Sequence, residues 1–95
     1  MKSRHARDYM RKLLRGYREY FGRGPALNSD GRRLLNDIVR ELAKEGGELA
    51  SIGRRVRRDP TLENVVKLAR LMLGREADEL LAEGAYGLLE GVEEG

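Results

Sequence analysis

Apolar residues recur at steps of three and four along most of this chain, and that spacing limits its fold more than any other feature. The first series runs from Ala6 to Phe21 and places its apolar side chains on one side of a helix. Similar series run from Leu35 to Val56 and from Leu62 to Leu73. No segment shows the alternation of a half-buried strand. We therefore expect an all-α fold of about three to five helices, packed as a small bundle that homo-oligomerisation completes.

Length and composition indicate one small domain over residues 1–95. Charged residues make up 37% of the chain, so a monomer buries a modest core and gains from association with other copies. The first helix is expected over about residues 3–21, and residues from about 84 to 95 are expected to form an acidic, frayed end. No apolar run reaches the roughly 18 residues of a membrane span and no signal peptide is visible, so we expect a cytoplasmic protein without membrane partners.

Glycine and proline mark the expected ends of the helices. The segment 22–28 contains two glycines and a proline and is expected to form a loop. Ser29-Asp30 can cap the following helix, because either side chain can accept a hydrogen bond from a free backbone N–H. Asp59-Pro60 is the firmest boundary, since proline disfavours a helical residue before it and suits the first position of a helix. We expect a helix to begin at Pro60 with Asp59 as its cap.

The pair Gly46-Gly47 leaves two structures open. The apolar residues on either side of it keep one helical phase: Leu35, Ile38, Val39, Leu42, Leu49, Ile52 and Val56. At about 100° per residue, Gly46 and Gly53 lie in the same stripe as Leu42, so one long helix could use them for the close approach of another helix. Alternatively the helix breaks at the pair, because two adjacent glycines cost roughly 2 kcal/mol of helix propensity relative to alanine.

Charge is distributed unevenly along the sequence. Residues 1–25 carry eight basic against two acidic residues, a balance of +6, and residues 26–74 carry ten against seven, a balance of +3. Residues 75–95 carry one against seven, a balance of −6. This pattern allows binding of a polyanion, pairing within the molecule, or head-to-tail association between molecules. Fifteen of the nineteen basic residues are arginine, a bias found in thermophiles and also produced by GC-rich coding.

Five arginines of the first helix form what we term the N-terminal arginine stripe: Arg4, Arg7, Arg11, Arg15 and Arg18. On a helical wheel they fall within a sector of about 80°, opposite the apolar residues. The stripe is about 21 Å long at 1.5 Å per residue, which is enough to meet several phosphates of a nucleic-acid backbone. A solvated face is the alternative.

The aromatic and aliphatic residues of this helix lie on the side opposite the arginines. We therefore expect Tyr9, Leu13 and Tyr17 to pack against a core or another copy, and we do not expect the tyrosine rings to stack on bases.

A second arginine cluster consists of Arg54, Arg55, Arg57 and Arg58. Arginines near the end of a helix interact favourably with its dipole and can hydrogen bond to its last carbonyls. Four arginines within five residues exceed what capping requires. The second arginine cluster is therefore expected to add phosphate contacts to those of the stripe.

The stretch Arg40 to Arg58, RELAKEGGELASIGRRVRR, resembles a helix-turn-helix in outline. Ala43 is followed four residues later by a turn glycine, Gly47, and then by a short helix that carries arginines. The usual apolar residues of that motif are missing at three positions: Gly46, Glu48 and Gly53. The resemblance implies a DNA-binding regulator whose groove-facing residues would be Ser51, Arg54, Arg55 and Arg58.

The sequence offers little for catalysis. It has no cysteine and one histidine, His5, and it lacks the common metalloprotease, phosphate-loop and serine-hydrolase motifs. Glu76, Glu79 and Glu83 share a helix face, as in some sites for hard cations, but an acidic solvated surface is the commoner reason for such a face. We expect no enzymatic activity, no cofactor and no metal site.

These features favour a nucleic-acid-binding protein that contacts the phosphate backbone of DNA or RNA with little sequence specificity. A packaging, nucleoid, virion or accessory-complex role fits best, with a second copy and a larger protein complex as further partners. The main alternative is a homo-oligomeric assembly or adaptor protein in which basic residues of one copy dock on the acidic end of the next. Its contacts would join Arg11, Arg15 and Arg18 to Glu90, Glu93 and Glu94.

Overall fold

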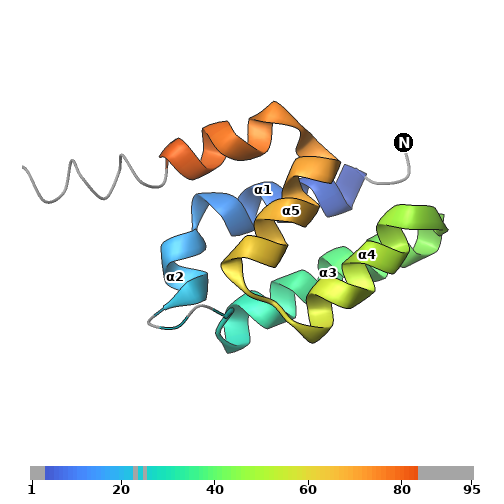
Figure 1. Ribbon diagram of the computed structural model, residues 1–95, viewed down its shortest axis with the longest axis horizontal. Helices are drawn as coiled ribbons and strands as arrows, with labels where there is room; N and C mark the ends of the chain where they lie inside the picture. The colour runs from blue at the N-terminus through green and yellow to red at the C-terminus, as the bar shows by residue number, and fades with distance from the viewer. Residues whose placement is uncertain (1–3, 23, 25, 84–95) are drawn as a thin grey trace, which may run out of the picture.

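The computed structural model describes residues 4–22, 24 and 26–83, and these residues form an all-helical fold (Figure 1). The helices are α1 (Arg4–Arg15), α2 (Tyr17–Phe21), α3 (Ser29–Glu45), α4 (Gly47–Arg58) and α5 (Leu62–Leu73), followed by a helical segment over residues 75–83. The expectation of an all-α fold is confirmed, but the described residues form six helices where three to five were expected. The predicted acidic end over about 84–95 lies outside the described residues.

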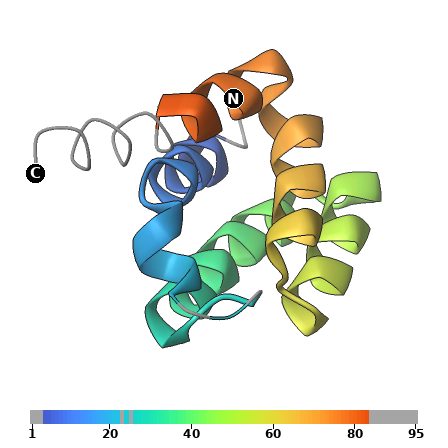
Figure 2. The same cartoon turned by 60° about the vertical axis from the view of Figure 1, so that its left-hand side comes forward.

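Helix α3 lies at the centre of the contacts between helices. It packs against α1, α2 and α4, and α5 packs against α4 and α1. Figure 2 shows the segment 75–83 lying across α1 after the chain has passed α5. Among the described residues, the largest fully buried side chains are apolar and come from α1, α3 and α5: Met10, Leu13, Leu14, Leu35, Ile38, Val39, Leu42, Val65 and Leu68. The core therefore forms where the apolar faces of these three helices meet.

The single helix expected over about residues 3–21 is instead two helices, α1 and α2, separated by Gly16. Glycine costs about 1 kcal/mol relative to alanine inside a helix, so the chain departs from helical geometry there at low cost. The ring of Tyr20 lies close to Gly16: a Cβ on Gly16 would be 3.1 Å from Tyr20 Cε2. The change of direction allows Phe21 at the end of α2 to be buried.

The caps of α3 and α5 differ from those expected. Asn28 caps α3, with its side chain accepting a hydrogen bond from Gly31 N at 2.9 Å, in place of Ser29 or Asp30. Helix α5 begins at Leu62 and is capped by Thr61, whose Oγ1 accepts from Asn64 N at 3.2 Å.

A contact between distant segments explains why α5 does not begin at Pro60 with Asp59 as its cap. Leu27 N donates to Pro60 O at 2.9 Å, and Ala26 and Thr61 form an isolated antiparallel bridge. These contacts hold residues 60 and 61 in an extended conformation. The helix can therefore start only after them.

The chain breaks at Gly46-Gly47 and does not continue as one long helix. Gly46 has φ 74° and Gly47 has φ 78°, values in the left-handed region that glycine adopts readily. Helix α4 folds back beside α3 (Figure 1). Gly53 faces α3, where an added Cβ would lie 3.2 Å from Leu42 Cδ1 and 3.5 Å from Val39 Cγ2. Gly53 thus permits a close helix contact within the chain, whereas Gly46 is exposed in the turn.

We predict that Gly31→Ala destabilises the fold. A Cβ at this buried position would lie 2.6 Å from Leu27 Cδ2 and 3.1 Å from the backbone oxygen of Tyr20, which cannot move without disturbing α2. The expected net loss is about 1–2 kcal/mol, because overpacking outweighs the gain in helix propensity. Urea unfolding followed by circular dichroism measures it. Gly24→Ala is the matched control, since its Cβ would have no neighbour closer than 4.0 Å; equal midpoints for the two variants would contradict the prediction.

Candidate nucleic-acid interface

The N-terminal arginine stripe lies along α1 and α2 and is only partly free. The side chains of Arg7, Arg15 and Arg18 are exposed, and Arg11 is half-buried. The predicted contact at Arg4 concerns a side chain outside the described part of the chain. The stripe therefore faces solvent as the helical wheel predicts, but its centre at Arg11 is covered by another part of the chain.

Arg11 is covered by Glu76 at the start of the segment 75–83. Arg11 Nε donates to Glu76 Oε2 at 2.6 Å, and Arg11 Nη2 donates to Glu76 Oε1 at 3.3 Å. A third hydrogen bond runs from Arg11 Nη1 to Asp8 Oδ1 at 2.8 Å. A planar guanidinium matches a carboxylate in this two-bond geometry, so Arg11 is held in place and has few donors left for a phosphate.

One turn further along α1, Arg15 Nε lies 4.0 Å from Glu83 Oε2. Glu76 and Glu83 are seven residues apart and so share a face of the segment 75–83, which lies on the side of the arginines. The pairing of basic and acidic regions within the molecule, one of three interpretations of the charge pattern, thus occurs through Glu76 and Glu83. The contacts expected for Glu90, Glu93 and Glu94 lie outside the described residues.

The aromatic residues of α1 and α2 face the core. Tyr9, Tyr17 and Tyr20 are half-buried and pack against the buried cluster, in which Leu13 is fully buried. The ring of Tyr9 also stacks on that of His5, with centroids 6.4 Å apart. Rings held in this way have little free surface on which a base could stack.

The second arginine cluster lies at the end of α4, and all four of its side chains are exposed. Within the described ranges, no carboxylate approaches any of the four within 4.0 Å. Two of the last carbonyls of α4, Arg55 O and Val56 O, accept from Asp59 N, and in the described ranges none of the four arginine side chains donates a hydrogen bond to a carbonyl of α4. The cluster is therefore a concentration of positive charge with neither an ion-pair partner nor a capping role in the described structure.

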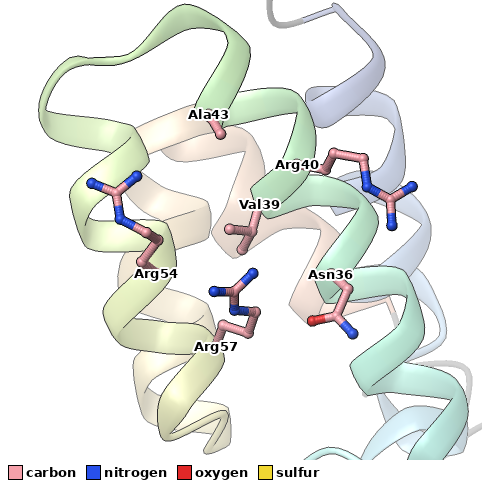
Figure 3. Close-up of a pocket in the computed structure, with 6 residues that line it drawn as sticks. All are labelled: Asn36, Val39, Arg40, Ala43, Arg54 and Arg57. Atoms are coloured by element: carbon pink, nitrogen blue, oxygen red, sulfur yellow. The ribbon is translucent and has the colours of Figure 1, made fainter.

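A groove of about 600 Å³ runs between α3 and α4 beside this cluster (Figure 3). Its lining consists of Asn36, Val39, Arg40, Ala43, Arg54 and Arg57. Figure 3 shows Arg57 extending into the space between the two helices, with Val39 at its base. Arg40 extends from α3 away from α4, and its Nη1 lies 3.5 Å from Asp37 Oδ1. The groove thus offers guanidinium and amide donors over an apolar base.

Arg55 lies on the other flank of α4. It lines a smaller hollow of about 230 Å³ between α4 and α5, together with Lys67 and Asn64. The second arginine cluster therefore reaches both sides of α4, and each side has further polar donors from the neighbouring helix. Sequence reasoning missed Asn36, Arg40 and Lys67, because only the reversal at Gly46-Gly47 and the return of α5 bring them beside the cluster.

Helices α3 and α4 do not have the geometry of a helix-turn-helix. Only Gly46 separates them, and they lie side by side in opposite directions (Figures 1 and 2). A helix-turn-helix joins its helices by three or four residues and crosses them at about 90–120°, which presents the second helix to a DNA groove. Ser51, Arg54, Arg55 and Arg58 are all exposed on α4, but the angled first helix of that motif is missing.

No family model, curated protein or solved structure matches this chain in sequence or fold comparisons. In the described ranges, none of the helices is both long enough and apolar enough to cross a membrane. Any functional assignment therefore rests on the charges and contacts of the residues themselves.

We predict that the contact between Arg11 and Glu76 makes stability depend on pH in a defined direction. The hydrogen bonds from Arg11 hold the pKa of Glu76 below its ordinary value of 4.5, with smaller contributions from the charges of Arg11, Arg15 and Arg7. A lowered folded-state pKa means that ionised Glu76 stabilises the fold above the unfolded-state pKa. This stabilisation is lost as the pH falls through the folded-state value.

The test compares the wild type with Glu76→Gln by urea unfolding from pH 7 down to pH 3. The wild type should have the higher midpoint at pH 7, and the difference should shrink as the carboxyl group is protonated. Glu79→Gln serves as the control, since Glu79 is exposed and has no ion pair among the described residues. A difference between wild type and Glu76→Gln that stays constant over this pH range would contradict the assignment.

Proposed function

We propose that this protein binds nucleic acid through backbone phosphates, with the second arginine cluster and the groove between α3 and α4 as the main contact surface. The observation that carries this proposal is the absence of ion-pair partners for four exposed arginines in the described structure. Exposed cations with no internal partner retain their full capacity to bind an external anion. A polyanion satisfies several of them at once, and a single small anion does not.

Guanidinium groups suit this task because each presents a planar fork of donors that matches two phosphate oxygens. Binding releases the counterions condensed on the nucleic acid, and this release dominates affinity when the contacts are to phosphates. Such contacts carry little sequence information. The proposal therefore covers both DNA and RNA, with a packaging, nucleoid, virion or accessory-complex role in the cytoplasm as its setting.

The N-terminal arginine stripe takes a secondary part in this proposal. Arg7 and Arg18 are exposed and available, whereas Arg11 is held by Glu76 and Arg15 lies near Glu83. Freeing Arg11 for a phosphate would leave Glu76 without its hydrogen-bond donor. The acidic segment 75–83 thus competes with phosphate on α1 and directs binding towards α4.

The test compares two triple variants that remove the same number of positive charges. Replacing Arg54, Arg57 and Arg58 by glutamine should weaken binding to a generic duplex at least about tenfold at low salt and reduce the salt slope by roughly 3. Replacing Arg7, Arg15 and Arg18 by glutamine is the matched control and should weaken binding less. Fluorescence anisotropy titrations at several salt concentrations measure both quantities. Equal losses of affinity in the two variants would mean that binding depends on the net charge of the protein and not on the second arginine cluster. Unchanged binding by the first variant would refute the proposed surface.

A homo-oligomeric assembly or adaptor role is the second candidate, and one observation favours it. Basic residues of α1 already contact acidic residues of the segment 75–83 within the chain, through Arg11 with Glu76 and Arg15 with Glu83. The same complementary surfaces can meet between two copies if the segment is exchanged. Nucleic-acid binding and assembly are compatible, since the second arginine cluster takes no part in these contacts.

A further inference from the structure

We infer that two copies of this chain can exchange α4, α5 and the segment 75–83 by straightening at Gly46-Gly47. In the exchanged dimer α3 and α4 form one helix over residues 29–58, and residues 47–83 of each copy pack on α1 to α3 of the other. The partner is thus a second copy of this chain. The inference is independent of the proposed nucleic-acid binding, because it rests on the hinge and on the apolar phase of the helices.

The first observation concerns the connection between α3 and α4. A single residue, Gly46, separates the two helices, and both Gly46 and Gly47 have left-handed φ values. Neither glycine has any atom within 4 Å of the position that a Cβ would occupy. A methyl group at either position would therefore meet no clash, and the turn requires glycine only for its backbone conformation. A short hinge of this kind is where exchange between copies begins.

The second observation is the phase of the apolar residues across the hinge. If the chain always reversed direction at Gly46, the apolar residues before and after the turn would not need to follow one continuous helical phase. Here Leu35, Ile38 and Leu42 continue in steps of three and four through Gly46 to Leu49, Gly53 and Val56. A straight helix over residues 29–58 would be about 45 Å long and would carry one uninterrupted apolar stripe. Gly46 would lie in that stripe, where two long helices can cross closely.

The third observation is that the contacts made by residues 47–83 can be reproduced between copies. These contacts include the packing of Gly53 on Val39 and Leu42, the bridge between Ala26 and Thr61, and the ion pair of Arg11 with Glu76. Exchange changes which copy supplies each partner and leaves the local geometry unchanged. The difference between the two forms is then confined to the hinge and to the entropy of association.

The hinge can be shifted by substitution. Alanine disfavours the left-handed conformation of Gly46 and Gly47 and favours a continuous helix at both positions. Gly46→Ala combined with Gly47→Ala should lower the dissociation constant of the dimer at least about a hundredfold, as measured by light scattering after size-exclusion chromatography over a range of concentrations. Gly22→Ala is the matched control. Gly22 also has a left-handed φ of 50°, but Pro25 three residues later prevents alanine at this position from joining α2 and α3 into one helix.

A disulfide distinguishes exchange from ordinary dimerisation. The chain has no cysteine, and opposite residues of an antiparallel bridge lie within disulfide range. Ala26→Cys with Thr61→Cys should form a bond within the chain in the monomer and between chains in the exchanged dimer. Non-reducing electrophoresis after refolding at increasing protein concentration separates the two. In both the wild-type and the alanine hinge backgrounds, the interchain fraction should rise with concentration.

Two results would overturn the inference. One is a hinge variant that is folded by circular dichroism and remains monomeric at every concentration tested. The other is a disulfide that stays within the chain in all oligomers, which would show that copies associate without exchange. The disulfide test in the wild-type hinge background keeps the inference falsifiable if the alanine variant does not fold.

Discussion

Helix α4 packs closely on α3 at Gly53, and this contact holds α4 on the return path that leads to α5 and the segment 75–83. Because Gly53 has no side chain, the backbone of α4 approaches Val39 and Leu42 directly. This approach becomes possible once the chain has reversed at Gly46-Gly47. The reversal brings Thr61 back beside Ala26, so that α5 starts near the N-terminal end of α3. The segment 75–83, which follows α5, then lies across α1 (Figure 2). The positions of both the arginines and the glutamates follow from this path.

The same path divides the positive charge into two parts with different availability. The segment 75–83 brings Glu76 and Glu83 to α1, where they engage Arg11 and approach Arg15. No acidic residue of the described structure plays this part on α4, where the second arginine cluster stays open to solvent. A chain with a formal net charge of only +3 thus presents a locally strong basic surface. A phosphate backbone responds to this local concentration of charge and not to the net value.

Local sequence patterns predicted the parts of the structure that depend on local geometry. Periodicity identified the helices and placed the tyrosines of α1 and α2 inward and the arginines outward, because a helix fixes its own faces. The break at Gly46-Gly47 was one of two predicted outcomes, since two glycines weaken a helix whose apolar phase nevertheless continues. The predicted cap of α5 was wrong: Thr61 caps the helix in place of Asp59. The reason is the hydrogen bond from Leu27 N to Pro60 O, which joins residues far apart in the sequence.

Long-range pairing is also why the sequence could not identify the surface in full. Arg11 and Glu76 are 65 residues apart, and the spacing of residues within α1 or within the segment 75–83 does not predict that the two side chains meet. The sequence showed that Glu76 and Glu83 share a helix face, but it did not show that this face meets the arginines of α1. Likewise the groove beside Arg57 exists only because α3 and α4 lie side by side, which depends on the direction of the turn at Gly46.

Binding of the phosphate backbone of nucleic acid by the exposed arginines of α4 is our main proposal. A fluorescence anisotropy titration of the wild-type protein with a generic duplex and a single strand, from low to high salt, tests it most directly. We expect binding to both at low salt and a logarithm of affinity that falls linearly with the logarithm of salt concentration, with a slope of about −3 or steeper for the duplex. Absence of binding even at low salt, or an affinity that does not change with salt, would contradict it.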